Sequence, residues 1–265
     1  VTRGVEAVQY VAPLDGLRAL AALVVAAYHA QVPSLTGGFF GVDIFFVLSG
    51  YLITRLLMDE HERTDRIAMG AFLARRLRRL WPALLLMLAA YLVASPWVWP
   101  EVSWTKHAIA AALTASYVVN WAPSVGQELA YLGHVWSLAV EMQFYLAWPL
   151  LFLLLVRLPR RALVPTMALL YAAATAWRWW GGEHLPQAWD VYLRTDMHCS
   201  GLLLGCLLAA IDRKLHEAWA LVGLGVLLLA VTFFSTHWPP TVHYGFTIAE
   251  IGAALLVMSR PAWLG

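Results

Sequence analysis

The sequence predicts an all-α fold, a polytopic bundle of about eight or nine hydrophobic transmembrane helices. Of its 265 residues, 61% are hydrophobic and only 13% are charged, and the mean hydropathy is +0.67. Soluble domains carry about 25% charged residues, so this composition indicates a membrane protein. Apolar runs of about 20 residues, the length needed to cross a bilayer, also recur along the whole chain.

Each expected helix is an apolar run bounded by polar, proline or glycine residues. The nine candidates are residues 15–33, 39–58, 81–99, 105–121, 137–156, 162–180, 197–211, 218–236 and 243–259. No internal repeat is visible, so residues 1–265 are expected to form a single transmembrane domain. The first helix is expected to remain in the protein, because further apolar runs follow it instead of a soluble domain.

The distribution of arginines predicts how the helices are oriented. The stretch from Arg55 to Arg79 contains seven arginines, and shorter basic stretches lie at 157–161 and 212–214. Cytoplasmic loops are enriched in Lys and Arg, so all three stretches are expected in the cytoplasm. The sequence therefore predicts a multi-pass protein of the plasma membrane, the inner membrane in a bacterium, with a cytoplasmic N-terminus.

One part of the chain does not fit the alternation of loops between the two sides of the membrane that these basic stretches require. Two complete crossings between residues 81 and 121, followed by one at 137–156, would place the basic stretch 157–161 outside. We therefore expect one segment within 99–136 to be re-entrant or interfacial, and favour 120–138. Such a backbone is tolerated at membrane depth only where protein surrounds it.

The first expected helix, "LDGLRALAALVVAAYHA", carries Asp15, Arg18 and His29. Arg18 and His29 are eleven residues apart, which places them on nearly one face and about 16 Å apart along the helix. Asp15 can cap the helix and contact Arg18. Ionisable residues at membrane depth are costly and mark functional sites. The alternative is an Arg18 that extends to the interface and a His29 bonded to a neighbouring carbonyl.

The second expected helix, within "GGFFGVDIFFVLSGYLIT", contributes Asp43. A short hairpin joins the two helices, so Asp43 and His29 are expected to meet. A carboxylate that accepts from one imidazole nitrogen leaves the other nitrogen free as a base. Alternatively, Asp43 only caps its helix. Ser49 and Gly50 are expected to allow close helix packing.

The stretch "HVWSLAVEMQFYLAWP" predicts a second set of polar residues. His134 and Glu141 are seven residues apart and would share one helical face. No ligand spacing such as H-E-x-x-H is present, so no metal is expected. Glu141 is expected to be catalytic. The residues expected to bind a substrate are His134, Trp136, Ser137 and Tyr145.

A basic cluster precedes the third apolar run, in "FLARRLRRLWP". Its arginines are Arg75, Arg76, Arg78 and Arg79. Positive charges beside a span commonly anchor the helix at the cytoplasmic interface and contact anionic lipids. Arginine clusters also bind phosphates through paired hydrogen bonds, so the cluster is alternatively a phosphate site.

Taken together, these motifs resemble the acyltransferase-3 family of integral membrane O-acyltransferases. The resemblance covers at least residues 13–157, with a weaker similarity in "YLRTDMHCSGLLLGCLLA". It implies transfer of an acyl group, commonly acetyl, from cytoplasmic acyl-CoA to a hydroxyl of a carbohydrate or other acceptor. It also implies that Arg18 and His29 are essential and that the basic cluster handles the acyl-CoA donor.

The expected catalytic residues are therefore Arg18, His29, Asp43 and Glu141. His29 either deprotonates the acceptor hydroxyl as it attacks the thioester, which we favour, or carries the acyl group itself. A transporter or flippase that uses the buried Arg, His and Asp as a pathway is the alternative function. Membrane lipids are expected partners, and a net charge of +2 gives no indication of nucleic acid binding.

The sequence also departs from the family pattern. Met142 stands where the family often has a second acidic residue, and the chain ends at "SRPAWLG" without the family's Ser-Tyr and His segment. The domain is therefore expected to lack the family's last helices.

Overall fold

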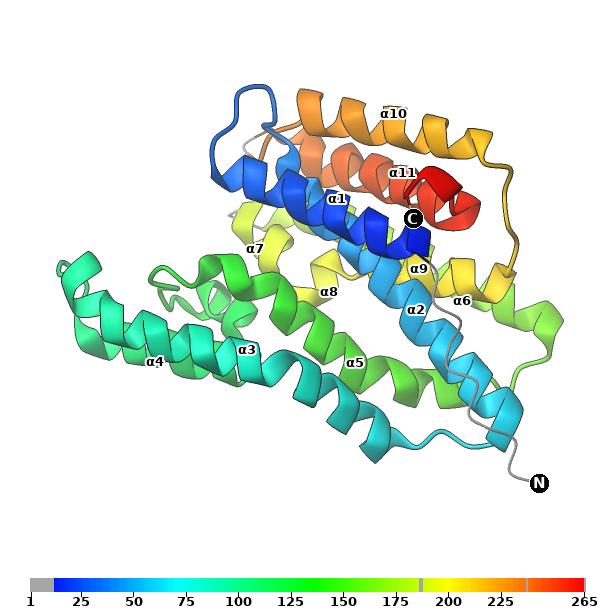
Figure 1. Cartoon of the computed structure of the whole chain (residues 1–265), viewed down its shortest axis with the longest axis horizontal. Coiled ribbons are helices and arrows are strands. Elements are labelled where there is room, and N and C mark those ends of the chain that lie inside the picture. Colours follow the sequence, from blue (N-terminus) through cyan, green and yellow to red (C-terminus); the bar gives the residue numbers. More distant parts are fainter. Residues whose placement is uncertain (1–11, 186–187, 237, 265) are drawn as a thin grey trace.

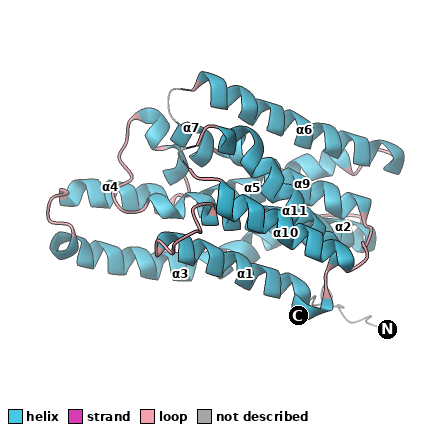
Figure 2. Ribbon diagram, turned by 90° about the horizontal axis from the view of Figure 1, so that it is seen from above, coloured by secondary structure: helices cyan, strands magenta, loops and turns pink. Residues whose placement is uncertain are grey.

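A computed structural model describes residues 12–185, 188–236 and 238–264, which form a helical bundle without strands (Figures 1 and 2). The predicted all-α class is confirmed. The α-helices are α1 (Ala12–His29), α2 (Gly41–Thr64), α3 (Met69–Val98), α4 (Trp104–Ala115), α5 (Trp136–Leu155), α6 (Arg160–His184), α7 (Ala188–Leu193), α8 (Thr195–His198), α9 (Ser200–Ile211), α10 (Ala218–Phe233) and α11 (Phe246–Ser259).

Each of the nine apolar runs overlaps a helix, although the run 105–121 is an α-helix only as far as Ala115, and the predicted number of crossings is not confirmed. Four described helical stretches combine the length and hydropathy of a membrane span: Gly38–Thr64, Met69–Val98, Gly133–Leu155 and Thr241–Ser259. Helix α3 begins at Met69, earlier than the predicted residue 81, so the basic cluster is helical. Arginine is a good helix former, and the apolar residues of this stretch recur at helical spacing.

The segment expected not to cross the membrane contains one short helix and an irregular connection. Helix α4 has 12 residues and is about 18 Å long, shorter than the hydrocarbon core of a bilayer. Gln143 Nε2 donates to the Tyr117 carbonyl at 2.7 Å and to Asn120 Oδ1 at 2.9 Å in the connection that follows. Protein groups therefore satisfy its polar atoms, as a re-entrant segment requires. Its membrane topology stays a prediction.

The end of α2, the start of α6 and the end of α9 lie at one end of the bundle, on the right in Figure 1, and α3 begins nearer the middle of its lower edge. At the right-hand end Arg55 of α2 forms an ion pair with Asp212, which follows α9, at 2.6 Å. The end of α1, whose last residue is His29, and the connection from α1 to α2 lie at the opposite end (Figure 1). The grouping agrees with one basic face, and the cytoplasmic assignment of that face stays a prediction.

Helix α2 is the central helix, and it packs most closely against α9. A Cβ at Gly50 would collide with the Leu202 carbonyl, and one at Gly205 would collide with the Val47 carbonyl. Glycines at both positions let the backbones touch, as expected for Gly50. Two hydrophobic clusters meet at α2, one reaching α3 and α5 and the other reaching α1, α10 and α11.

Candidate active site

His29 is the last residue of α1 and its side chain is exposed. Its Nδ1 lies 2.9 Å from the backbone carbonyl of Val25. A carbonyl oxygen only accepts hydrogen bonds, so Nδ1 is the donor and Nε2 of the neutral ring keeps its lone pair. The contact with the Val25 carbonyl matches the alternative interpretation of His29 from the sequence. It leaves Nε2 of His29 available as a base at the end of α1.

The predicted contact between His29 and Asp43 is wrong. Asp43 is 1% exposed and binds Nε2 of His198 through Oδ1 at 3.0 Å. The hairpin brings α1 and α2 together, but α2 turns Asp43 toward α8 while His29 stays on the exposed side of α1. His198 was not identified from the sequence, because a lone histidine in "TDMHCSG" belongs to no recognisable spacing.

Arg18 forms the predicted ion pair with Asp15, at 3.0 Å. Their side chains are 31% and 46% exposed, so Arg18 keeps access to the surroundings. Arg18 also exerts an electrostatic attraction on Glu141 of α5, although no direct ion pair joins these two described residues.

Glu141 lies at the centre of a polar group contributed by α2 and α5. Ser49 donates a short hydrogen bond to Glu141, and the Tyr145 hydroxyl donates to Ser49 Oγ at 3.4 Å. Ser49 therefore does more than allow close packing, the role expected from the sequence. Glu141 is only partly buried, so the group keeps an open side.

The basic cluster divides into one inward arginine and three exposed ones. Arg76 lies over the rings of Phe72 and Tyr145, with its guanidinium carbon 5.6 and 5.7 Å from their centres. Its buried Nε has no hydrogen-bond partner in the described part of the chain. The exposed members are Arg75, Arg78 and Arg79. Arg76 alone joins the Glu141 group, and the others remain available to lipid headgroups or phosphates.

The residues expected to bind a substrate are only partly brought together. His134 is exposed on the 3-10 turn Gly133–Val135 and interacts electrostatically with His29. Ser137 is partly buried. Trp136, 5% exposed, packs in the core, whereas Tyr145 belongs to the Glu141 group. The outer end thus presents His29 and His134 together.

A second buried polar group, which the sequence did not reveal, joins α6, α9 and α11. Arg178 binds Glu250 at 3.0 Å, and both side chains are 0% exposed. Ser200 donates to Glu250 at 2.5 Å and Tyr171 donates to it at 3.1 Å. Arg178 also donates to Thr247 at 2.6 Å. The charges are paired within the protein, which favours a structural role.

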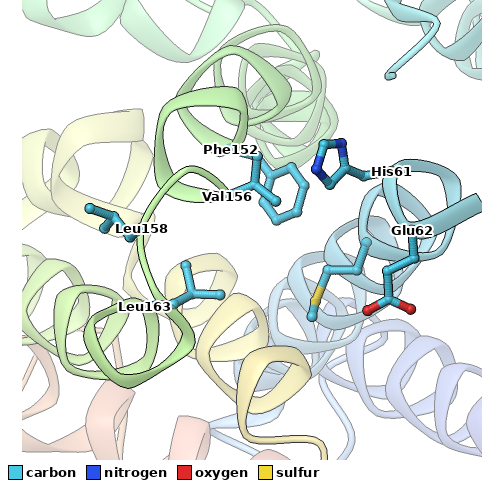
Figure 3. Close-up of a pocket in the computed structure, with 7 residues that line it drawn as sticks. His61, Glu62, Phe152, Val156, Leu158 and Leu163 are labelled. Carbon is cyan, nitrogen blue, oxygen red and sulfur yellow. The ribbon is translucent and has the colours of Figure 1, made fainter. Parts of the chain in front are cut away.

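A pocket of about 210 Å³ opens at the basic end of the bundle. Figure 3 shows its lining from the ends of α2 and α5 and the start of α6: Met58, His61, Glu62, Phe152, Val156, Leu158 and Leu163. None of these residues belongs to the predicted site. Within the described residues, no group of three or more His, Cys, Asp or Glu side chains is arranged to hold a metal ion.

Comparisons with known proteins bear on this arrangement. A family model described as an acyltransferase domain matches residues 11–264. Peptidoglycan O-acetyltransferase OatA of Listeria monocytogenes is 34% identical over 283 residues, covering 96% of this chain and 45% of that protein. O-acetyltransferase OatA of Staphylococcus aureus is 36% identical over 251 residues, covering 85% of this chain and 40% of that protein. The chain thus spans less than half of each relative, and no solved structure gives a significant match.

Proposed function

The chain belongs to the acyltransferase-3 family, as its motifs predict, and on that premise we propose that it transfers an acyl group to a carbohydrate hydroxyl. The acyl group is acetyl and the acceptor a peptidoglycan-like glycan, by analogy with the names of the relatives. The donor is a cytoplasmic acyl-CoA. The observation that carries the proposal is the exposed His29, whose Nδ1 is bound to a backbone carbonyl.

In the proposed reaction His29 acts as a general base. Its Nε2 takes the proton of the acceptor hydroxyl as that oxygen attacks the thioester carbonyl. The carbon–sulfur bond breaks, the ester forms, and the imidazolium returns the proton to the leaving thiolate. Because the Val25 carbonyl holds Nδ1–H, no carboxylate is needed to fix the tautomer.

Arginines placed deeper in the bundle hold the donor phosphates in this proposal. Arg18 lies eleven residues before His29 on the continuous helix α1, a separation of about 16 Å. The phosphopantetheine arm of coenzyme A contains about thirteen bonds between phosphorus and sulfur, or about 15 Å when extended. Phosphate near Arg18 and Arg76 would therefore allow the thioester to reach His29. The Glu141 carboxylate attracts both guanidinium groups electrostatically.

The test compares two histidines that occupy equivalent positions. His184 ends α6, is exposed, and places Nδ1 2.8 Å from the Trp180 carbonyl, as His29 does at the end of α1. Membranes containing the wild type, His29→Gln or His184→Gln are given labelled acetyl-CoA and peptidoglycan fragments. We expect His29→Gln to lower transfer by about a hundredfold or more, as for the loss of a general base, and His184→Gln to match the wild type.

Two outcomes would contradict parts of the proposal. Equal transfer by His29→Gln and the wild type would remove His29 from the mechanism. Absence of transfer by every protein, at matched expression and with a range of glycan acceptors, would contradict the acyltransferase function of this chain.

A further inference from the structure

The proposed mechanism leaves unused a buried acid–base pair, Asp43 and His198. Each side chain is 1% exposed, and Asp43 Oδ1 lies 3.0 Å from His198 Nε2. On the other side of the ring, Nδ1 donates to the Tyr192 carbonyl at 2.6 Å. The bond to Asp43 therefore contains one shared proton, and the pair is neutral overall wherever that proton resides. Burial and the Asp43 charge raise the pKa of Tyr192 well above its ordinary value, so its hydroxyl stays protonated.

Aromatic rings enclose the His198 imidazole. The ring centres of Phe246 and Trp136 lie 4.5 and 5.1 Å from that of His198. Those of Tyr192 and Phe46 lie 5.3 and 5.6 Å away. The imidazole cannot rotate without displacing a neighbour in so dense a core. The hydrogen bond with Asp43 and these neighbouring rings together hold the His198 imidazole in place, and Trp136 packs against that imidazole.

Trp136 connects this pair to the candidate site. It is the first residue of α5, and His134 lies two residues earlier on the preceding turn. His134 is exposed and interacts electrostatically with His29. A displacement of the Trp136 ring would move the start of α5 and the turn that carries His134. Ring contacts therefore run from the buried pair to Trp136, and the chain leads from Trp136 to His134, which acts on His29 electrostatically.

We propose that Asp43 and His198 are positioning residues that seat Trp136 and thereby hold His134 opposite His29. This inference rests on the proposed function, in which His29 is the base. Asp43 acts on the outer site through His198 and Trp136, without contacting His29. In this proposal Asp43 serves the geometry of the acceptor side and does not activate the base.

A neighbouring carboxylate provides a matched control. Glu250 and Arg178 act electrostatically on Asp43, but they are paired with each other at 3.0 Å. Glu250 is as deeply buried as Asp43, and its link to His198 is indirect, through Arg178, whose guanidinium carbon lies 5.4 Å from the centre of the Phe246 ring. Asp43→Asn and Glu250→Gln each replace a buried carboxylate by an amide of the same shape. A general loosening of the bundle would affect both variants alike.

The first measurement reports position without requiring activity. A His134→Cys reporter is labelled with a membrane-impermeant maleimide, after subtracting the labelling of native Cys199 and Cys206 in the parent protein. We expect Asp43→Asn to change the labelling rate by about tenfold, within the range for coupled residues, and Glu250→Gln to leave it unchanged. Equal changes in the two variants, or no change with Asp43→Asn, would overturn the proposal.

The second measurement uses acyl transfer in the same membranes. Asp43→Asn and Trp136→Phe should each raise KM for the acceptor, and the double variant should lose no more than the worse single one. The pH profile set by His29 should stay in place. Additive losses, or a pH profile displaced by Asp43→Asn, would overturn the inference. If Asp43→Asn does not fold, Trp136→Phe in the reporter background must alter labelling.

The transfer and labelling measurements distinguish a failure of the proposed function from a failure of the positioning role. Without transfer by the wild type, the proposed function is contradicted while the labelling still decides whether Asp43 positions His134. With transfer present and labelling unaffected, the proposed function stands and the positioning role is wrong.

Discussion

Two serine–glutamate hydrogen bonds lie in different halves of the bundle, and their surroundings differ in charge. Ser200 and Glu250 share their site with Arg178, which binds the carboxylate at 3.0 Å with both charged side chains fully buried. Ser49 and Glu141 have no bonded arginine in the described part of the chain, and Glu141 is partly exposed. Arg178 neutralises the Glu250 carboxylate within the protein, whereas the Glu141 carboxylate remains open to a cation or a ligand.

This difference separates structure from function more clearly than burial alone. A fully paired charge has no capacity left for a substrate, and its cost of burial is offset by hydrogen bonds. Around Glu141, Arg18 and Arg76 attract the carboxylate without binding it, whereas Arg178 binds Glu250 directly. A carboxylate kept near cations without a bonded cation is costly, and such groups are characteristic of binding sites.

The largest expected effect is a loss of unfolding free energy in the half of the bundle where Arg178 is paired with Glu250. Arg178→Met leaves Glu250 as a buried charge without its cation, which costs about 3–5 kcal/mol of the free energy of unfolding. The exposed Arg157→Met is the control and should change stability little. Unfolding of the purified protein in mixed detergent micelles measures both. A loss from Arg178→Met as small as the control's would remove the distinction between the two halves.

Local patterns predicted the half that contains Glu141 better than the half that contains Glu250. Eleven-residue spacing placed Arg18 and His29 on α1, and the short reach to Asp15 gave the observed ion pair. Arg178 and Glu250 are 72 residues apart, so no local period relates them. The partner of Asp43 failed for the same reason, because His198 is 155 residues away.

Replacing Glu141 should lower activity without lowering stability, which is the opposite of the effect expected for Glu250. Glu141→Gln removes the charge that attracts Arg18 and Arg76, and we expect kcat/KM for acyl transfer to fall by about ten- to a hundredfold, or about 1.4–2.8 kcal/mol. Its unfolding free energy should not fall, because an incompletely paired and partly buried charge is removed. Glu250→Gln should lose stability and keep kcat/KM. The same response from both glutamines would contradict the comparison.

Ser200 and Ser49 allow the same comparison with smaller expected losses of stability. Ser200→Ala leaves Glu250 and Arg178 each without one partner where no solvent reaches, an expected loss of about 1–3 kcal/mol. Ser49→Ala should cost less, because Glu141 is partly exposed and water can replace the hydroxyl. Detergent unfolding of both variants gives the difference. A larger loss from Ser49→Ala would mean that the Glu141 group is the structural one.

The smallest expected effect separates the two tyrosines. Tyr171 donates to Glu250 at 3.1 Å, whereas Tyr145 donates to Ser49 at 3.4 Å, a weaker geometry. Removing Tyr171's hydroxyl with Tyr171→Phe should cost about 1 kcal/mol, the usual net value of a buried hydrogen bond. Tyr145→Phe should cost about half of that, since Phe keeps the ring face that lies beneath the Arg76 guanidinium. Its effect should appear instead as a raised KM for acetyl-CoA, because Arg76 would lose part of its polar surroundings while remaining in place. Unfolding and donor KM measured on both variants separate the two roles, and a raised donor KM in Tyr171→Phe alone would assign the donor to the paired half.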